Sequence, residues 1–442
     1  MSILHQPAES LAALRTQGEA LRKQMPRRDH AKLVLPERDV VAILEDQHRT
    51  RLPDLVPVRV GRMLQSPFAF YRGAAAVMAH DLADAPSTGI EVIACGDAHV
   101  ANFGLYATPE RTLAFDLNDF DEASNAPWEW DVKRLAASAL IGALDSGLRP
   151  DQARGVAEAS VRSYRETLSQ MMQMTALERY YYRGETSWLK ATLDSETQQL
   201  VRQVARKAKR NTSERMLDKV ELDQTENGTR IVDEPPIVRH DPYITDDLVQ
   251  RLTGEYLSSV RADIAVLLGQ FKVVDTVLRV VGVGSVGTRC YIQLLTGLSN
   301  EPFFLQIKEA QASVLETYGG RPSLIHNRTV RPRSGLNGFR VVSCQRTLQA
   351  ASDPFLGYLE ENGRDYYVRQ FRDMKGSLDL KAIDLTQWQQ YAALCGALLA
   401  RGHSQSGTAG IIDGYLQGSA RFDSAVTDWA VAYAEVTERD FA

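Results

Sequence analysis

The chain has 442 residues, of which 44% are hydrophobic and 24% charged, a composition ordinary for a globular protein. Its formal net charge of -5 argues against a nucleic-acid partner, because nucleic-acid binders usually carry a strongly basic face. The four cysteines form no CxxC pair and no apolar run is long enough to span a membrane, so we expect a cytoplasmic protein without a zinc knuckle, a disulfide framework or a membrane partner.

Helical patterns dominate the first 250 residues. Residues 1–65 are polar and predict a helical extension that ends in the proline-punctuated stretch RLPDLVPVRV. After it we expect, in chain order, a helix at 66–83, a short β-branched strand at 90–94, helices at 131–148 and 152–174, a charged helix with a solvated basic face at 201–210, and a hairpin turn at Asn227-Gly228.

From residue 271 the pattern changes from helical to extended. Residues 271–295 predict a strand, a glycine turn and a second strand, and EPFFLQIKEA (301–310) predicts a third. RVVSCQRTLQ (340–349) and DYYVRQFRD (365–373) add two strand-like runs. We therefore predict an α+β protein with a largely antiparallel sheet here and with helices again from residue 381.

The glycine turn GVGSVG places Gly282, Gly284 and Gly287 in a GxGxxG pattern. A dinucleotide-binding fingerprint requires a helix directly after such a turn, whereas the following TRCYIQLL predicts a strand. Strand, glycine turn and strand form the lid that covers nucleotide phosphates in protein kinases. The pattern alone also fits a bulged hairpin that binds nothing.

The next strand carries a lysine among apolar neighbours. Lys308 needs a partner for its ammonium group if it lies inside the sheet, and a phosphate oriented with the help of a carboxylate would supply one. We assign that carboxylate to Glu316 in the helix-like QASVLETY, because Glu309 points to the other face of the strand. A lysine that reaches solvent along an edge strand fits the same pattern.

Two polar stretches, GDAHVANFG and FDLNDFDEA, carry the residue types that phosphoryl transfer requires. Asp97 and Asn102 fit D-x-x-x-x-N, in which the aspartate orients the nucleophile and the asparagine binds a metal ion. Asp116 follows at the end of the next predicted strand. We therefore predict Asp97 as the catalytic residue, and Asn102 and Asp116 as ligands of Mg²⁺, which prefers oxygen donors.

Several neighbouring residues allow more than one interpretation. Asp119 is expected to be a further ligand of the metal, although it also fits a solvated loop acid. Asp121 and Glu122 each fit a metal ligand and a solvated loop acid equally well. Arg72, in FYRG, fits either a partner for a phosphate or carboxylate group or a member of a structural ion pair.

These motifs resemble known families. GDAHVANFG and LAFDLNDFDE are similar to the catalytic and metal-binding loops of aminoglycoside-phosphotransferase-type and related protein-kinase-like enzymes, and PWEWDVKRLA resembles the segment that braces their catalytic loop. That resemblance implies supporting roles for His99 and Asp131. More closely, SPFAFYRGAA, GDAHVANFG, NDFDEA, WEWDVKRLAAS, QRTLQAASDPFLG and YYVRQFRDMKGS resemble the bacterial family catalogued as domain of unknown function 2252.

The sequence departs from the kinase-like pattern in three ways. Cys95 stands where the phosphotransferases have a histidine, and Arg289 stands where protein kinases have a valine. The order of the motifs along the chain also differs from that in kinases, because Asp97 precedes Lys308 instead of following it. A circular permutation would reconcile that order, with the helix QWQQYAALCGALLARGH near the C-terminus leading into the Asp97 loop.

The resemblance thus implies a two-lobed, circularly permuted kinase-like fold that uses ATP and Mg²⁺ to phosphorylate an unknown hydroxyl acceptor; transfer of AMP fits the same residues. A non-catalytic nucleotide-binding module and a metallophosphoesterase are the alternatives. The expected divisions are an N-terminal helical extension, a large-lobe part with the catalytic and metal loops, the small-lobe sheet, and C-terminal helices that complete the large lobe, at residues 1–65, 66–250, 251–380 and 381–442.

Overall fold

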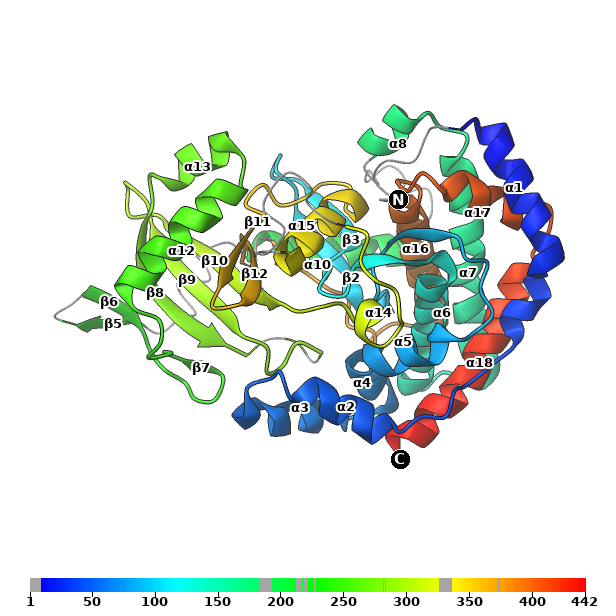
Figure 1. The fold of residues 1–442 in the computed structure, drawn as a ribbon, viewed down its shortest axis with the longest axis horizontal. Helices are drawn as coiled ribbons and strands as arrows, with labels where there is room; N and C mark the ends of the chain where they lie inside the picture. Colours follow the sequence, from blue (N-terminus) through cyan, green and yellow to red (C-terminus); the bar gives the residue numbers. More distant parts are fainter. Residues whose placement is uncertain are drawn as a thin grey trace.

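The chain folds into a mixed α+β structure with antiparallel sheets, as the sequence predicted. In the computed structural model, the largest sheet and its helices form one side of the molecule and most of the helices form the other (Figure 1). The structure describes residues 9–182, 193–211, 217, 222–225, 228–280, 282, 284–325, 336–371 and 374–442.

The helical side is built around α6 (Trp128–Asp145), which is buried along nearly its whole length. It packs against α7 (Pro150–Met171) and α18 (Arg421–Phe441), and α7 packs closely against α16 (Leu385–His403). Other helices of the described residues, outside the region of the largest sheet in the chain, are α1 (Leu11–Gln24), α2 (Val40–His48), α3 (Val56–Met63), α4 (Pro67–Gly73), α5 (Ala75–Ala83), α8 (Ala176–Tyr181), α10 (Ser195–Lys209) and α17 (Ala409–Leu416). Within the described residues, none of the helices is both long and apolar enough to cross a bilayer.

Two short antiparallel pairs carry the predicted catalytic and metal loops. β1 (Glu91–Ala94) pairs with β4 (Ser124–Pro127), and β2 (Phe103–Ala107) pairs with β3 (Leu113–Leu117). The loop from β1 to β2 contains Asp97, and the loop from β3 to β4 contains the acidic residues. The two pairings therefore bring both loops to the same place in the fold.

The largest sheet of the described residues has the order β11-β12-β10-β9-β8-β7, with antiparallel pairing throughout. The helices α12 and α13 precede β8, and α14 and α15 lie between β10 and β11 in the chain. The bounds are β7 Val238–Arg239, α12 Asp246–Ser259, α13 Ala262–Leu268, β8 Lys272–Arg279, β9 Cys290–Thr296, β10 Pro302–Ala310, α14 Val314–Thr317, α15 Leu336–Leu348, β11 Gly357–Glu361 and β12 Arg364–Gln370. A separate hairpin pairs β5 (Leu222–Thr225) with β6 (Gly228–Ile231), and Asn227 of its predicted turn lies outside the described residues.

One predicted strand is wrong, because residues 340–349 lie largely in helix α15. The β-branched pair Val341-Val342 favours a strand locally, but tertiary packing overrides that preference. Val341, Val342, Cys344 and Leu348 are buried, while the Arg340 guanidinium donates to the carbonyls of other segments. The helix expected at 66–83 is also interrupted, at Ala74 between α4 and α5.

The end of α16 lies beside β1, despite a separation of about 300 residues in the chain. The Ile93 amide donates to Ser406 Oγ at 3.0 Å, and Thr408 Oγ1 donates to the Glu91 carbonyl at 2.6 Å. The segment expected to lead into the Asp97 loop is therefore adjacent to the strand that enters it.

The close packing of α7 on α16 yields a prediction about stability. A Cβ added at Gly396 would lie 2.0 Å from the Ser160 carbonyl oxygen, so Gly396→Ala should destabilise the protein by about 3 kcal/mol or more. Gly254→Ala is the matched control, because Gly254 lies in α12 with open space around it, and alanine there should be neutral or stabilise by about 0.5–1 kcal/mol. Thermal unfolding of both variants measures the difference; equal melting temperatures would contradict this packing.

Candidate functional site

A cleft of about 730 Å³ brings together the segments that the motifs singled out. Its walls include the segment from α2 to α4, the end of β10, and the first turn of α14. The residues of the predicted loops that line it are Asp97, Asn102, Asp119, Asp121, Glu122, Gly284 and Ser285.

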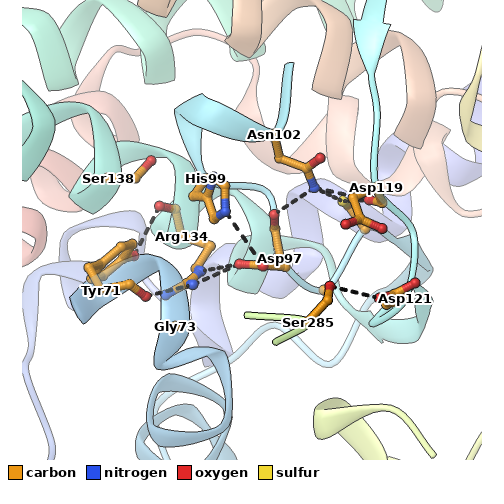
Figure 2. Close-up of polar contacts among 12 residues, drawn as sticks. Tyr71, Gly73, Asp97, His99, Asn102, Asp119, Asp121, Arg134, Ser138 and Ser285 are labelled. Atoms are coloured by element: carbon orange, nitrogen blue, oxygen red, sulfur yellow. Dashed lines mark hydrogen bonds and ion pairs between the residues drawn. The ribbon is translucent and has the colours of Figure 1, made fainter. Parts of the chain in front are cut away.

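Asp97 is held by an arginine. Asp97 Oδ1 accepts from Arg134 Nε at 2.9 Å and from Arg134 Nη2 at 2.7 Å (Figure 2). Arg134 is itself anchored, because its Nη2 donates to the Tyr71 carbonyl and its guanidinium stacks 4.1 Å from the centre of the Tyr71 ring. Oδ2 of Asp97 has no hydrogen bond of comparable length within the described residues and lies 3.6 Å from His99 Nε2.

His99 is neutral near pH 7, because burial lowers its pKa to about 4 even though Asp97 opposes that shift. Asp131 braces the backbone of the same loop: its carboxylate accepts from the Cys95 amide at 2.6 Å and from the Gly96 amide at 2.9 Å. His403, at the end of α16, approaches the Asp131 carboxylate at 3.1 Å. An imidazole from a distant helix thus supports the Asp97 loop through Asp131.

Lys308 points from β10 into the acidic stretch, which we define as residues 118–122. Its ammonium group forms an ion pair with Asp121 Oδ2 and lies 3.4 Å from Asp119 Oδ2. Tyr367, on the neighbouring strand β12, donates its hydroxyl to Asp121 Oδ1 at 2.8 Å. The lysine is almost fully buried, so these two carboxylates are the partners that the apolar strand required.

Lys308 and the carboxylates of the acidic stretch change one another's pKa values. Burial alone would lower the pKa of Lys308, but Asp119 and Asp121 raise it well above its usual range. Burial opposes the ionisation of Asp119, yet Lys308 lowers the pKa of Asp119 below its ordinary value. Burial, followed by repulsion from Asp119, raises the pKa of Asp121. Burial also raises the pKa of Glu122 to about 7.

The glycine turn (Gly282 and residues 284–287) lies over the acidic stretch. Ser285 Oγ reaches Asp121 Oδ2 at 3.4 Å, across 164 positions of the chain (Figure 2). Gly282 and Gly287 adopt positive φ angles of 72° and 91°, which favour glycine. The segment before α3 fastens the turn, since the Leu52 amide donates to the Gly287 carbonyl at 2.8 Å.

Asn102 joins the two loops through its amide group. Nδ2 donates to the Asp97 carbonyl at 3.0 Å and to the Asp119 carbonyl at 2.9 Å, so the two loops keep a constant separation. Asn102 also lines the cleft.

Two predicted site residues lie elsewhere. Asp116 is buried outside the cleft, where its carboxylate accepts from the Leu117 and Ala350 amides, each at 2.9 Å. Its position at the end of β3 turns it toward α15, whereas Asp119 and Asp121 reach Lys308. Glu316 lies on the four-residue helix α14 and takes no part in the contacts of Lys308, which pairs with the acidic stretch instead.

The chain matches, over residues 51–442, the family described as "Uncharacterized protein conserved in bacteria (DUF2252)". It belongs to this family. The resemblance of the motifs to this bacterial family is thereby confirmed. Comparison with curated proteins and with solved structures found no match.

The DUF2252 match covers the Asp97 loop, the acidic stretch and the glycine turn, whereas cleft residues on α2 precede it. Sequence reasoning missed Arg134 among the residues of this site. The signal was present in WEWDVKRLA, where Arg134 follows Asp131 by three positions and therefore lies on the same helix face. The burial of both charges on one helix face would have pointed to partners in a neighbouring loop.

The oxygen donors of this site fit a magnesium ion whose coordination is completed by water and phosphate. Within the described ranges, no three His, Cys, Asp or Glu side chains converge to form a complete metal site. Mg²⁺ does not require one, because it commonly binds through one or two carboxylates together with water and substrate phosphates. The carboxylates of Asp119 and Asp121, which both line the cleft, meet that requirement.

The raised pKa of Glu122 predicts a pH-dependent stability. Because folding raises this pKa from 4.5 to about 7, the resulting stabilisation is fully present below pH 4.5 and is lost as the pH rises through 7. Glu122→Gln stays neutral and can still accept from the Val314 amide. Between pH 5 and pH 8 the melting temperature of the wild type should therefore fall relative to the variant by a few degrees, equivalent to about 3 kcal/mol. Parallel melting curves across this range would contradict the burial of Glu122.

Proposed function

We propose that this protein is an ATP- and Mg²⁺-dependent phosphotransferase with a circularly permuted, kinase-like arrangement of two lobes. The observation that carries the proposal is the position of Lys308, which pairs with Asp119 and Asp121 beneath the glycine turn. Phosphoryl transfer depends on a lysine, an acidic metal site and a glycine-rich cover that meet around the phosphates.

The order of elements in the sheet supports this proposal. The glycine turn joins β8 to β9, Lys308 lies on the following strand β10, and the helix α15 comes before the next strand. Protein kinases place their glycine-rich loop, their lysine on the third strand and a helix in that order. The catalytic and metal loops precede the sheet here, and the contact of Ser406 with Ile93 provides the junction that a permutation needs.

The residues of the cleft would divide the work as follows. Asp97, held by Arg134, would orient the acceptor hydroxyl and accept its proton through Oδ2. Lys308 and the backbone of the glycine turn would bind the nucleotide phosphates. Asn102, Asp119 and Asp121 would hold Mg²⁺, which would neutralise charge on those phosphates. The acceptor remains to be identified, and AMP transfer fits the same geometry.

Turnover of labelled ATP tests this proposal. ATP labelled at the γ or the α position, incubated with Mg²⁺ and a library of metabolites, should label an acceptor from the γ position in the case of phosphoryl transfer and from the α position in the case of AMP transfer. Asp97→Asn can still accept from Arg134 but loses the base, so its rate should fall by about 10²- to 10⁴-fold while ATP binding persists. Equal turnover by the wild type and Asp97→Asn would favour a non-catalytic nucleotide-binding module.

A second test separates Asp119 from Asp116. ATP with Mg²⁺ at 100 times its dissociation constant should stabilise the wild type by about 2.7 kcal/mol in thermal unfolding. Asp119→Asn should remove most of the magnesium-dependent part of this stabilisation. Asp116→Asn should lower the melting temperature of the free protein but leave that part intact, because Asp116 lies outside the cleft. If Asp116→Asn removed the magnesium-dependent stabilisation and Asp119→Asn kept it, Asp116 would be the metal ligand instead. Stabilisation by Mn²⁺ or Zn²⁺ without nucleotide, lost in His99→Ala, would instead indicate a metallophosphoesterase.

A further inference from the structure

Arg72 is a partly buried arginine that lines the cleft and has no hydrogen-bond or ion-pair partner in the described part of the chain. It lies near the end of α4, where Figure 2 shows the neighbouring Tyr71 and Gly73 close to Asp97 and Arg134. Its guanidinium forms no hydrogen bond or ion pair with the described residues, and its Nε is completely shielded from solvent. By contrast, the buried Arg134 and Arg38 each pair with an aspartate. The structural ion pair that the sequence allowed for Arg72 is thus not formed within the described part of the chain.

Two more arginines on the same wall of the cleft also lack a carboxylate partner. Arg51 donates to the Val286 carbonyl, and its Nε has no hydrogen-bond partner among the residues that the structure describes. Arg59 is fully buried and donates only to neutral groups, at the side chains of Gln47 and His48 and at the Gly73 carbonyl. No aspartate or glutamate of the described residues forms an ion pair with Arg51, Arg59 or Arg72, so nearby carboxylates such as Asp97 and Glu122 act on their charges only at longer range.

This wall carries an electrostatic cost in the free protein. Burial lowers the pKa of Arg72, and burial together with the charge of Arg51 lowers the pKa of Arg59 to about 9. Buried charges are normally compensated by an opposite charge. A bound anion would supply that compensation, and guanidinium groups suit phosphate and carboxylate oxygens because they donate two parallel hydrogen bonds.

We propose that Arg72, supported by Arg51 and Arg59, forms an anion-binding subsite beside Asp97 that holds a phosphate or carboxylate group of the acceptor. The acceptor would then be an anionic alcohol, with its hydroxyl at Asp97 and its anionic group at Arg72. This assignment rests on the proposed function, in which Lys308 and the glycine turn bind the nucleotide phosphates and leave Arg72 for the acceptor. Arg72 directly follows Tyr71, whose carbonyl accepts from the same Arg134 guanidinium that holds Asp97, so the subsite lies on the Asp97 side of the cleft.

Inorganic phosphate is the probe, measured by thermal unfolding and calorimetry against sodium chloride of equal ionic strength. We expect phosphate to stabilise the wild type, and we expect Arg72→Gln to bind it at least tenfold more weakly. Arg49→Gln is the matched control, because Arg49 also lines the cleft but is exposed and already pairs with Asp46. Absence of stabilisation in the wild type, or equal losses in the two variants, would overturn the subsite.

The source of the anion is decided with ADP and Mg²⁺ on the wild type, which also covers the case that Arg72→Gln fails to fold. Phosphate that still binds in the presence of saturating ADP and Mg²⁺ supports an acceptor subsite. Competition between the two would assign Arg72 to the nucleotide and overturn the acceptor assignment. If phosphate binds but ADP with Mg²⁺ has no effect at all, the subsite stands and the proposed function fails.

Discussion

The ion pairing of Lys308 with Asp119 and Asp121 is the interaction on which the rest of the site depends. It joins a strand of the sheet to a loop of the helical side, across almost 190 positions of the chain. A buried ammonium group is costly unless carboxylates compensate it, so these charges require one another. Asp121, which pairs with Lys308, also accepts a hydrogen bond from Ser285 and so connects the glycine turn to the acidic stretch.

Around this pair, the cleft is lined by both carboxylates and guanidinium groups. The acidic stretch lies next to the lysine, and Arg51, Arg59 and Arg72 of the segment from α2 to α4 line the same cleft. Asp97 is fixed by Arg134 and by the loop backbone that Asp131 braces. On the proposed function, one cleft would hold a nucleotide with its metal at Lys308 and an anionic acceptor at Arg72.

The sequence predicted the local features of this site and missed those that depend on distant segments. The glycine turn, the strand of Lys308 and the strand before Gly96 follow from periodicity and turn chemistry, which neighbouring residues determine. The choice between Asp116 and Asp119 depends on where β3 ends relative to α15, and α15 was itself predicted as a strand because of its valines. The partner of Lys308 was sought in α14, whereas the acidic stretch that supplies it lies far back in the sequence.

A crystal structure with Mg²⁺ and a non-hydrolysable ATP analogue is the most direct test of the central claim. The account predicts the β- and γ-phosphates between Lys308 and the backbone of the glycine turn, with the metal ion bound by Asp119 or Asp121 and the γ-phosphate facing Asp97. An analogue bound outside this cleft, or bound inside it with its phosphates away from Lys308 and the acidic stretch, would contradict the account.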